Sequence, residues 1–451
     1  MKVTAVILAA GQGTRMRSAL PKVLHPLLGR PMVWYALEAA RQACGENPVL
    51  VIGHSGEAVR QVVGEAADFV LQEPQLGTGH AVLQAEAGLS GRSDLVLVTY
   101  ADMPLLTAET LTRLLQVHLE HPDSPVTLLS VVESDPRGFG RVIRDAQGRV
   151  TAIIEEAQAT PGQLRINELN AGVYCFSASW LWPALHRLPL SPKGEYYLTD
   201  IVGLAAAEGL SIQAVQVEDR RETIGINTRV HLAEAEAVLR NRVNQAWMLA
   251  GVTIIDPLST YIELGVEIGP DTTIWPNTCL QGQTVIGEGC SLGPNSIIRD
   301  SRLGNRCKVL ASVLEEAVLE EDVDVGPFAH LRKGAHLAQG VHMGNFGEVK
   351  NSYLGPGTKM GHFSYVGDAT IGPEVNIGAG AITCNYDGVK KNHTEIGAGA
   401  FIGSDTMLVA PVKIGAGAHT GAGAVVTKDV PEDSLAVGMP ARAIRKLNKR
   451  E

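Results

Sequence analysis

Aliphatic side chains recur every six positions through the second half of the chain, and Gly often follows them. The α-helix repeats every 3.6 residues and the strand every two, so neither explains this spacing. A triangular coil does, because each of its three short faces turns one aliphatic side chain inward. The sequence therefore predicts a parallel β-helix of hexapeptide repeats. The runs are Ile268, Ile274, Leu280, Ile286, Leu292, Ile298; Leu319, Val325, Leu331, Leu337, Met343; Leu354, Met360, Val366; and Ile396, Ile402, Leu408, Ile414.

The first half of the chain has a different pattern, in which apolar runs alternate with amphipathic stretches. Such alternation predicts an α/β domain with a Rossmann-like, mostly parallel sheet that binds ligands at the carboxyl ends of its strands. The expected strands are 3–8, 48–52, 95–100 and 126–132, and the expected helices are 32–43 and 107–119.

A glycine-rich loop follows the first expected strand, in Leu8-Ala9-Ala10-Gly11-Gln12-Gly13-Thr14-Arg15-Met16, with Pro21-Lys22 shortly after. Glycines let backbone N–H groups approach phosphate oxygens, and Arg15 and Lys22 supply positive charge. The spacing fits neither a P-loop nor the GxGxxG dinucleotide fingerprint. The loop on its own is either a tight turn or a phosphate cradle.

Two further stretches end at the same predicted sheet edge. Asp102 follows the strand that ends at Tyr100, where it is either a helix cap or a Mg²⁺ ligand, since Mg²⁺ favours one or two carboxylates together with substrate phosphates. A second glycine loop, from Gln72 through Gly77 and Thr78 to His80, suits recognition of a base by amide and backbone hydrogen bonds.

The complete pattern L-A-A-G-x-G-T-R-M…P-K resembles the signature of sugar-1-phosphate nucleotidylyltransferases, and the half that contains it looks like a uridylyltransferase acting on N-acetylglucosamine 1-phosphate. The resemblance implies that the loop residues Leu8 to Gly11, with Arg15 and Lys22, hold the phosphates of UTP. It implies that Gln72 and Gly77 read uracil beside Thr78 and Tyr100. It also implies that Asp102 and Asn227 hold Mg²⁺, and that the sugar phosphate meets Gly140, Glu155, Asn170 and Thr199.

Residues 228–250 are rich in Ala, Glu and Arg and contain neither Pro nor Gly, which predicts one helix between two domains. We expect a nucleotidyl-transfer domain at 1–228, a linker helix at 229–250 and a β-helix domain at 251–451. The net charge of −10 argues against a nucleic-acid partner, and no stretch is long enough to span a membrane. The six cysteines have no CxxC spacing, so we expect reduced thiols in a cytoplasmic protein.

Polar side chains interrupt the hexad repeat where a bare scaffold would not require them. His362 lies among cations, Tyr and Asn that could grip a sugar phosphate. Because imidazole titrates near neutrality, His362 suits a base that deprotonates an attacking amine. The alternative is a coil that serves only oligomerisation.

This half resembles hexapeptide acyltransferases, which implies a left-handed coil. Together the two halves resemble the bifunctional enzymes that make UDP-N-acetylglucosamine for bacterial peptidoglycan and lipopolysaccharide. That resemblance implies glucosamine-1-phosphate N-acetyltransferase activity with acetyl-CoA as co-substrate, and a homotrimer. It makes His362 the base, assisted by Glu348. By the same resemblance, Arg332, Lys350, Tyr365, Asn376 and Lys391 bind glucosamine 1-phosphate, Asn385 and Tyr386 lie where amine and acetyl group meet, and Ala379, Ser404 and Ala422 line the acetyl-CoA groove.

The chain departs from the family pattern at Ala101, where glycine is common, at Ala171, where threonine is common, and at Met439, near which an arginine usually meets CoA. Arg442 or another cation could replace that arginine. The basic tail 445–450 is either a solvated end or attracts the phosphates of CoA. Two other hypotheses stay open here: a nucleotidylyltransferase of different sugar or base specificity with an inert coil, and a non-catalytic regulatory subunit. The retained Arg15, Lys22 and Asp102 argue against the second.

Overall fold

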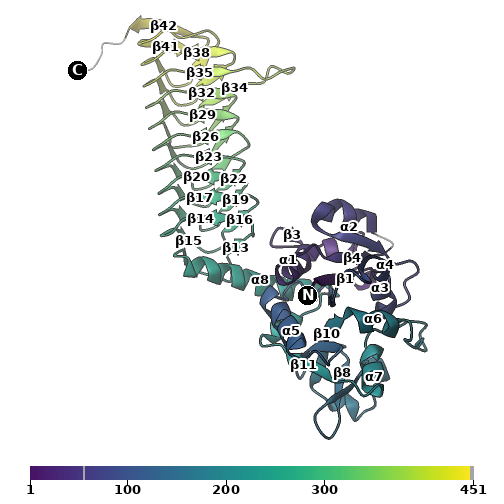
Figure 1. Ribbon diagram of the computed structural model, residues 1–451. Coiled ribbons are helices and arrows are strands. Elements are labelled where there is room, and N and C mark those ends of the chain that lie inside the picture. Colours follow the sequence, from purple (N-terminus) through teal and green to yellow (C-terminus); the bar gives the residue numbers. More distant parts are fainter. Residues whose placement is uncertain (54–55, 447–451) are drawn as a thin grey trace. The chain divides into compact units, whose positions relative to one another are not determined.

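The structure is a computed structural model that describes residues 1–53 and 56–446. The chain divides into two compact units, Met1–Leu239 and the part from Arg240 onward. The first unit is an α/β domain and the second is a parallel β-helix (Figure 1). Both predicted fold classes are therefore confirmed.

The first unit is built on a twisted, mixed sheet with strand order β11-β7-β10-β6-β1-β4-β5. The chain pairs in parallel from β6 through β1 and β4 to β5, and β11 is parallel to β7. Only β10 in this order runs against its neighbours β6 and β7. The strands are β1 (Val3–Ala9), β4 (Val49–Ile52), β5 (Asp68–Leu71), β6 (Leu95–Tyr100), β7 (Val126–Val132), β10 (Glu168–Ser177) and β11 (Ile212–Gln216), with the hairpins β2 (Pro26–Leu27)–β3 (Arg30–Pro31) and β8 (Arg141–Arg144)–β9 (Val150–Ile154).

Helices cover both faces of this sheet, and each face has its own apolar cluster. The core on one face contains side chains of α1, α2 and α5, and the core on the other contains side chains of α3, α6 and α7. The helices are α1 (Met32–Cys44), α2 (Gly56–Val63), α3 (Thr78–Leu83), α4 (Glu86–Leu89), α5 (Ala108–Glu120), α6 (Ala178–Leu185) and α7 (Asp200–Ala207). Short 3₁₀ turns lie at Thr14–Met16, Lys22–Leu24, Gly64–Ala66, Glu156–Gln158, Gln163–Arg165 and Arg220–Thr223.

The helix α8 (Arg229–Leu249) follows the first unit and continues past the unit boundary. Its residues carry no Gly or Pro, so nothing in the local sequence interrupts the hydrogen-bonding pattern. The chain then turns at Gly251, whose φ of 96° is in the left-handed region that glycine tolerates. None of the helices in the described ranges is long and apolar enough to cross a bilayer.

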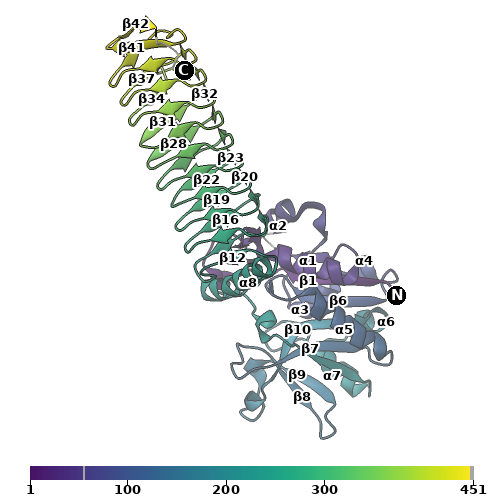
Figure 2. The ribbon, with the colours of Figure 1, turned by 90° about the vertical axis from the view of Figure 1, so that its left-hand side faces the viewer.

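The second unit stacks short strands of successive coils into three long parallel sheets, and Figure 2 shows this stacking. The first sheet contains β12 (Thr253–Ile254), β15 (Thr273–Ile274), β18 (Ser291–Leu292), β21 (Lys308–Val309), β24 (Asp324–Val325), β27 (His342–Met343), β30 (Lys359–Met360), β33 (Asn376–Ile377), β36 (Phe401–Ile402), β39 (His419–Thr420), β41 (Ser434–Gly438) and the antiparallel end strand β42 (Ala441–Lys446). The second contains β13 (Tyr261–Ile262), β16 (Cys279–Gln281), β19 (Ile297–Arg299), β22 (Val313–Glu315), β25 (His330–Leu331), β28 (Gly347–Lys350), β31 (Ser364–Gly367), β34 (Ile382–Cys384), β37 (Met407–Val409) and β40 (Val425–Val426). The third contains β14 (Glu267–Ile268), β17 (Val285–Ile286), β20 (Arg302–Leu303), β23 (Val318–Leu319), β26 (Ala335–Leu337), β29 (Ser352–Leu354), β32 (Ala369–Ile371), β35 (Thr394–Ile396) and β38 (Val412–Ile414).

Inward aliphatic side chains from successive coils stack on one another and form the core of the β-helix. Ile274 lies opposite Leu292, and Leu314 lies opposite Leu331, with all four fully buried. The register slips where the spacing falls to five residues, as between Ile298 and the buried Leu303. One coil also contains an inserted loop at 385–393, so that Ile371 lies opposite Ile396.

Candidate functional sites

The predicted glycine loop lines a cavity of about 340 Å³ at the carboxyl end of β1. The cavity brings together many residues of the predicted nucleotide site, from β1, β6 and the second glycine loop. These are Leu8, Ala9, Ala10, Gly11, Lys22, Gln72, Gly77, Thr78, Tyr100 and Asp102. Parallel strands deliver their carboxyl ends to one edge, which explains why segments so far apart in the sequence meet here.

Four polar side chains converge beside this cavity. The Lys22 ammonium donates to Asp102 Oδ2 and, at 3.2 Å, to Asn227 Oδ1. Arg15 donates to the same Asn227 oxygen at 3.0 Å. An acidic and an amide oxygen thus converge on one cation, and this oxygen pair is the donor set that Mg²⁺ accepts. The residues present therefore fit the metal. In this structure, the Lys22 ammonium is the cation that contacts the two oxygens.

The described residues contain no cluster of three or more His, Cys, Asp or Glu side chains that could hold a metal ion by themselves. A Mg²⁺ ion on Asp102 and Asn227 would need further oxygen ligands. Because Mg²⁺ is commonly bound by one or two carboxylates together with substrate phosphates and water, the bound nucleotide would supply those ligands.

The second glycine loop holds the side chain of Gln72 in one orientation. Gln72 is 4 % exposed, and its Nε2 donates to the carbonyl of Gly77 at 2.9 Å. A second contact joins Nε2 to Nδ1 of His80 at 3.2 Å, and burial lowers the pKa of His80, which favours the neutral ring. A Cβ atom at Gly77 would lie 2.6 Å from the carbonyl oxygen of Tyr196, so this position admits only glycine without a shift of backbone.

The residues predicted to bind the sugar phosphate form a neighbouring group. Thr199 Oγ1 donates to Glu155 at 2.8 Å, and the backbone N–H of Asn170 donates to Gly140 at 2.8 Å. Tyr100 lines the cavity together with Asp102 and is also near Glu155 of this group. Burial, followed by the charges of Asp102 and Glu155, raises the pKa of its phenol.

Some residues that line the cavity were not predicted as site residues. Glu195 lines it from the loop before α7, and Gln75 donates to the carbonyl of Ala10. A Cβ atom at Gly53 would meet both the Gln75 amide and the Ala10 carbonyl at 2.5 Å or less. Only the three-dimensional packing shows that Gly53 makes room for a side chain that supports the glycine loop.

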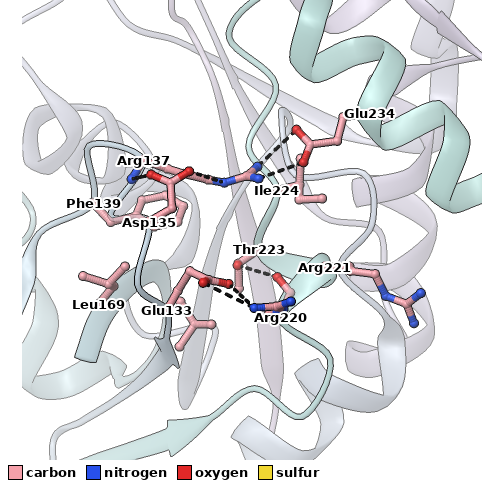
Figure 3. A pocket seen from close by; sticks show the side chains of 11 residues that line it. Glu133, Asp135, Arg137, Phe139, Leu169, Arg220, Arg221, Thr223, Ile224 and Glu234 are labelled. Carbon is pink, nitrogen blue, oxygen red and sulfur yellow. Dashed lines mark hydrogen bonds and ion pairs between the residues drawn. The ribbon is translucent and has the colours of Figure 1, made fainter. Parts of the chain in front are cut away.

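A separate cavity of about 290 Å³ lies beside the loop 133–139 (Figure 3). None of the described residues that line it belongs to the predicted site. Its charged groups neutralise one another: Arg137 pairs with Glu234 of α8 at 2.7 Å, and Arg220 pairs with Glu133 at 3.0 Å. This charge balance does not favour binding of an anionic substrate.

In the second unit, three of the predicted acetyl-transfer residues, Glu348, Lys350 and Tyr365, lie on the sheet that contains β25, β28 and β31. Glu348 lies opposite Tyr365, and Arg332 donates to Glu348 at 2.8 Å. The side chain of Lys391 and its charge, followed by the charge of Arg332, lower the pKa of Lys350. Lys350, Lys391 and Arg332 therefore lie near one another, with Arg332 paired to Glu348.

The side chain of Asn385 lies near that of Tyr365 and above Gly367. A Cβ atom at Gly367 would be 2.3 Å from the Tyr365 hydroxyl and 2.8 Å from Asn385 Nδ2, so glycine is required where these two side chains cross. Tyr386 is 61 % exposed and pairs with Lys391 across the inserted loop.

Other predicted residues occupy corners of the coil. The backbone N–H of Asp405 donates to the carbonyl of Ala379 at 2.7 Å, and that of Gly423 to the carbonyl of Ser404 at 2.8 Å, so the segments of Ala379, Ser404 and Ala422 follow one another along one edge. Asn376 lies in β33 opposite Lys359 and Phe401. His362 is exposed at the corner before β31. Glu348 accepts from Arg332, and no hydrogen bond between Glu348 and His362 occurs among the described contacts.

At the carboxyl end, Met439 is 77 % exposed at the turn between β41 and β42, and Arg442 lies opposite Val437 in that hairpin. Residues 447–450, which include most of the predicted basic tail, lie outside the described residues.

Comparison with known proteins covers both units. Residues 5–195 match the family of MobA-like NTP transferase domains, and residues 265–300 and 393–428 match the bacterial transferase hexapeptide repeats. Three relatives are each named bifunctional protein GlmU. The protein of Heliobacterium modesticaldum is 50 % identical over 437 residues, which is 97 % of this chain and 95 % of that protein. The protein of Pelobacter propionicus is 48 % identical over 439 residues (96 % and 95 %), and that of a Geobacillus species is 45 % identical over 449 residues (99 % and 97 %). With an N-terminal nucleotidyltransferase unit and a left-handed hexapeptide β-helix, the chain belongs to the family of bifunctional GlmU proteins.

Proposed function

We propose that this chain catalyses two consecutive reactions in the synthesis of UDP-N-acetylglucosamine, the activated sugar of bacterial cell-wall polymers. The β-helix domain, 251–451, transfers the acetyl group of acetyl-CoA to glucosamine 1-phosphate. The domain 1–228 then transfers UMP from UTP to N-acetylglucosamine 1-phosphate and releases pyrophosphate, and the helix 229–250 joins the two domains.

In the nucleotidyl-transfer domain, the backbone of Leu8 to Gly11 cradles the UTP phosphates beside Arg15 and Lys22. The amide of Gln72 and the backbone of Gly77 read uracil, and Thr78 and Tyr100 close the site. Gly140, Glu155, Asn170 and Thr199 hold the sugar phosphate.

The sugar phosphate attacks the α-phosphorus of UTP in line with the departing pyrophosphate. Such a reaction depends on positioning and on neutralisation of charge more than on a general base. Asp102 and Asn227 would hold Mg²⁺, which supplies positive charge at the phosphates when bound. The Lys22 ammonium, which contacts both of these oxygens in the structure, would then be available to donate to the phosphates of the nucleotide.

In the β-helix domain, Arg332, Lys350 and Lys391 bind the phosphate of glucosamine 1-phosphate, with Tyr365 and Asn376 beside the sugar. His362 takes a proton from the ammonium group, and Glu348 assists. The freed amine attacks the thioester carbonyl, the C–S bond breaks and CoA leaves as the thiol after protonation. Asn385 and Tyr386 lie at the reacting groups. Ala379, Ser404 and Ala422 line the acetyl-CoA groove, and the N–H of Ala379 can stabilise the oxyanion.

The observation that carries the proposal is the group of polar side chains on one face of the coil, in which Arg332 donates to Glu348, Glu348 lies opposite Tyr365, and Tyr365 and Asn385 cross above Gly367. A coil that served only oligomerisation would not need these polar groups together. We therefore do not favour the alternative in which the β-helix is inert and the first domain acts on another sugar.

We also propose that the protein is a cytoplasmic homotrimer. All six cysteines are free thiols, as expected for a reducing compartment. Phe328 and Phe346 stack with ring centroids 5.3 Å apart on the coil surface, although each is 60 % exposed. Packing between flat faces of three coils would bury such side chains. Sedimentation of the purified chain tests this directly, since an active monomer would contradict it.

Incubation of the purified protein with glucosamine 1-phosphate, acetyl-CoA, UTP and Mg²⁺, followed by mass spectrometry, tests the two activities together. We expect UDP-N-acetylglucosamine, CoA and pyrophosphate. N-acetylglucosamine 1-phosphate alone would refute the first domain's role, and UDP-glucosamine would refute the β-helix's role. The variant His362→Ala should lose the acetyl transfer and retain uridylyl transfer to N-acetylglucosamine 1-phosphate.

A further inference from the structure

Asp368 is a polar residue beside the proposed acetyl-transfer site to which neither the sequence nor the mechanism above gives a role. It occupies the corner between β31 and β32 with a left-handed φ of 50°. Its backbone N–H donates to Lys350 at 3.1 Å, and its carbonyl accepts from Thr394 at 3.1 Å. The corner is therefore fixed from the coils on both sides.

The two carboxylate oxygens of Asp368 have different partners. Oδ1 accepts from the side-chain amide of Asn351 at 2.6 Å, and Oδ2 accepts from Nδ2 of Asn385 at 2.5 Å. Partial burial opposes ionisation of Asp368. The hydrogen bonds from Asn351 and Asn385, followed by the charges of Lys391 and Lys350, outweigh it and lower the pKa of the carboxyl. Near neutral pH Asp368 is therefore a carboxylate, which accepts hydrogen bonds and donates none.

This contact settles the orientation of the Asn385 amide, which chemical shape alone leaves open. Since a carboxylate cannot donate, the NH₂ group of Asn385 must face Asp368, and Oδ1 must face the other way. The side chain has little freedom to turn, because Asn385 is 6 % exposed and crosses the Tyr365 hydroxyl above Gly367. The oxygen has no hydrogen-bond partner among the described contacts of Asn385, so it is the atom that can meet a ligand.

The orientation matters for an attacking amine. An amide oxygen accepts an N–H of the amine and leaves the nitrogen lone pair free to attack. An amide NH₂ would instead donate to that lone pair and make the amine a weaker nucleophile. We propose that Asp368 is a positioning residue for acetyl transfer, which holds Asn385 so that Oδ1 accepts from the amine of the acceptor sugar. This inference rests on the acetyltransferase function proposed above.

The variant Asp368→Asn tests the inference in the full-length protein. The new amide has nearly the same shape, but it can donate as well as accept, so it no longer dictates how Asn385 is turned. We expect kcat for acetyl transfer to glucosamine 1-phosphate to fall by about 10²-fold, the loss typical of a misplaced reacting group. KM for the sugar should change less than about threefold, as for an ordinary surface substitution.

An exchange of the two groups separates an acceptor role of Asn385 from a donor role. Asn385→Asp alone places two carboxylates together and should be impaired. In the double variant Asp368→Asn/Asn385→Asp, the amide at 368 donates to the carboxylate at 385, whose second oxygen again faces the amine. We expect the double variant to recover at least about tenfold of the lost kcat, consistent with coupling between two contacting residues.

Two controls keep the outcomes distinct. Asn351→Ala removes the other partner of Asp368 and should leave acetyl transfer within about threefold of the parent. Uridylyl transfer to N-acetylglucosamine 1-phosphate, measured on every variant, reports whether the protein is folded. Full activity of Asp368→Asn, or impaired single variants without recovery in the double variant, would overturn the inference. Absence of acetyl transfer in the parent protein would instead refute the proposed function.

Discussion

Replacement of Lys22 by alanine is the perturbation whose effect the structure defines best in the nucleotidyl-transfer domain. The side chain is 12 % exposed and contacts Asp102, which is 21 % exposed, and Asn227. Removal of one preorganised group that stabilises the developing charge of a transition state slows the reaction by about 10²–10³-fold, or about 2.7–4 kcal/mol. We therefore expect uridylyl transfer in Lys22→Ala to fall by at least this factor.

The fold should tolerate the same change. Removal of one partner from a fully buried ion pair destabilises a protein by about 3–5 kcal/mol, whereas an exposed pair contributes about 0–1 kcal/mol. Because Asp102 is 21 % exposed and lines the open cavity, this pair lies between the two limits, and we expect a decrease of about 1–3 kcal/mol in the free energy of unfolding.

A pyrophosphate-release assay with UTP, N-acetylglucosamine 1-phosphate and Mg²⁺ measures the loss, and acetyl transfer by the same preparation controls for folding. Lys2→Ala is a matched variant, since Lys2 pairs with Glu46 at 3.4 Å on the exposed surface. Uridylyl transfer by Lys22→Ala at a rate close to that of Lys2→Ala would refute the assigned site.

Three further predictions concern the base loop, the pH dependence and the coil. Gly77→Ala should raise KM for UTP by about tenfold, because φ is +99° and the new Cβ atom would meet the Tyr196 carbonyl, a strain of about 1–3 kcal/mol. Gly64→Ala is the control, since Gly64 has φ +58° and open space around it. Equal KM values for the two variants would contradict the reasoning. Burial lowers the pKa of His118 to about 4, so the unfolded chain binds the proton first as pH falls below about 6.5, and unfolding should become easier by about 2 kcal/mol at pH 5. Guanidinium titrations at pH 7.5 and 5 should show this difference in the parent and not in His118→Asn, and an equal pH dependence in both would contradict it. Leu331→Ala removes a fully buried coil side chain and should lower the free energy of unfolding by about 2–5 kcal/mol, so an unchanged denaturation midpoint would count against a tightly packed coil.

The parts of the fold that follow local patterns could be predicted from the sequence. The expected strands at 3–8, 48–52, 95–100 and 126–132 differ from β1, β4, β6 and β7 by at most one residue at either end. The hexad spacing predicted the coil because each inward side chain must meet its counterpart in the next coil.

Other features depend on packing that leaves little local signal. The strand β10, Glu168–Ser177, was not predicted, and it runs antiparallel to its neighbours β6 and β7, which makes the sheet mixed. The slips of the coil coincide with corners at which non-glycine residues such as Asp300, Ala311 and Glu316 adopt positive φ. Ala and Glu rarely adopt this conformation, so the identities of Ala311 and Glu316 do not predict a corner.

The candidate sites also combine residues that a local sequence pattern predicts with residues that only the folded structure brings together. The glycine loop and Lys22 form one short pattern, whereas Arg15 meets Asn227 from 212 residues away. Asp368 received no role from the sequence because a carboxylate at a coil corner is unremarkable until its partner, Asn385, is seen.

Crystals of the protein grown or soaked with UDP-N-acetylglucosamine and coenzyme A would test most directly whether one chain contains both active sites. The account predicts uracil against Gln72 and Gly77, and coenzyme A along the edge formed by Ala379, Ser404 and Ala422. Uridine density elsewhere in the first unit, or coenzyme A absent from that edge of the coil, would contradict it.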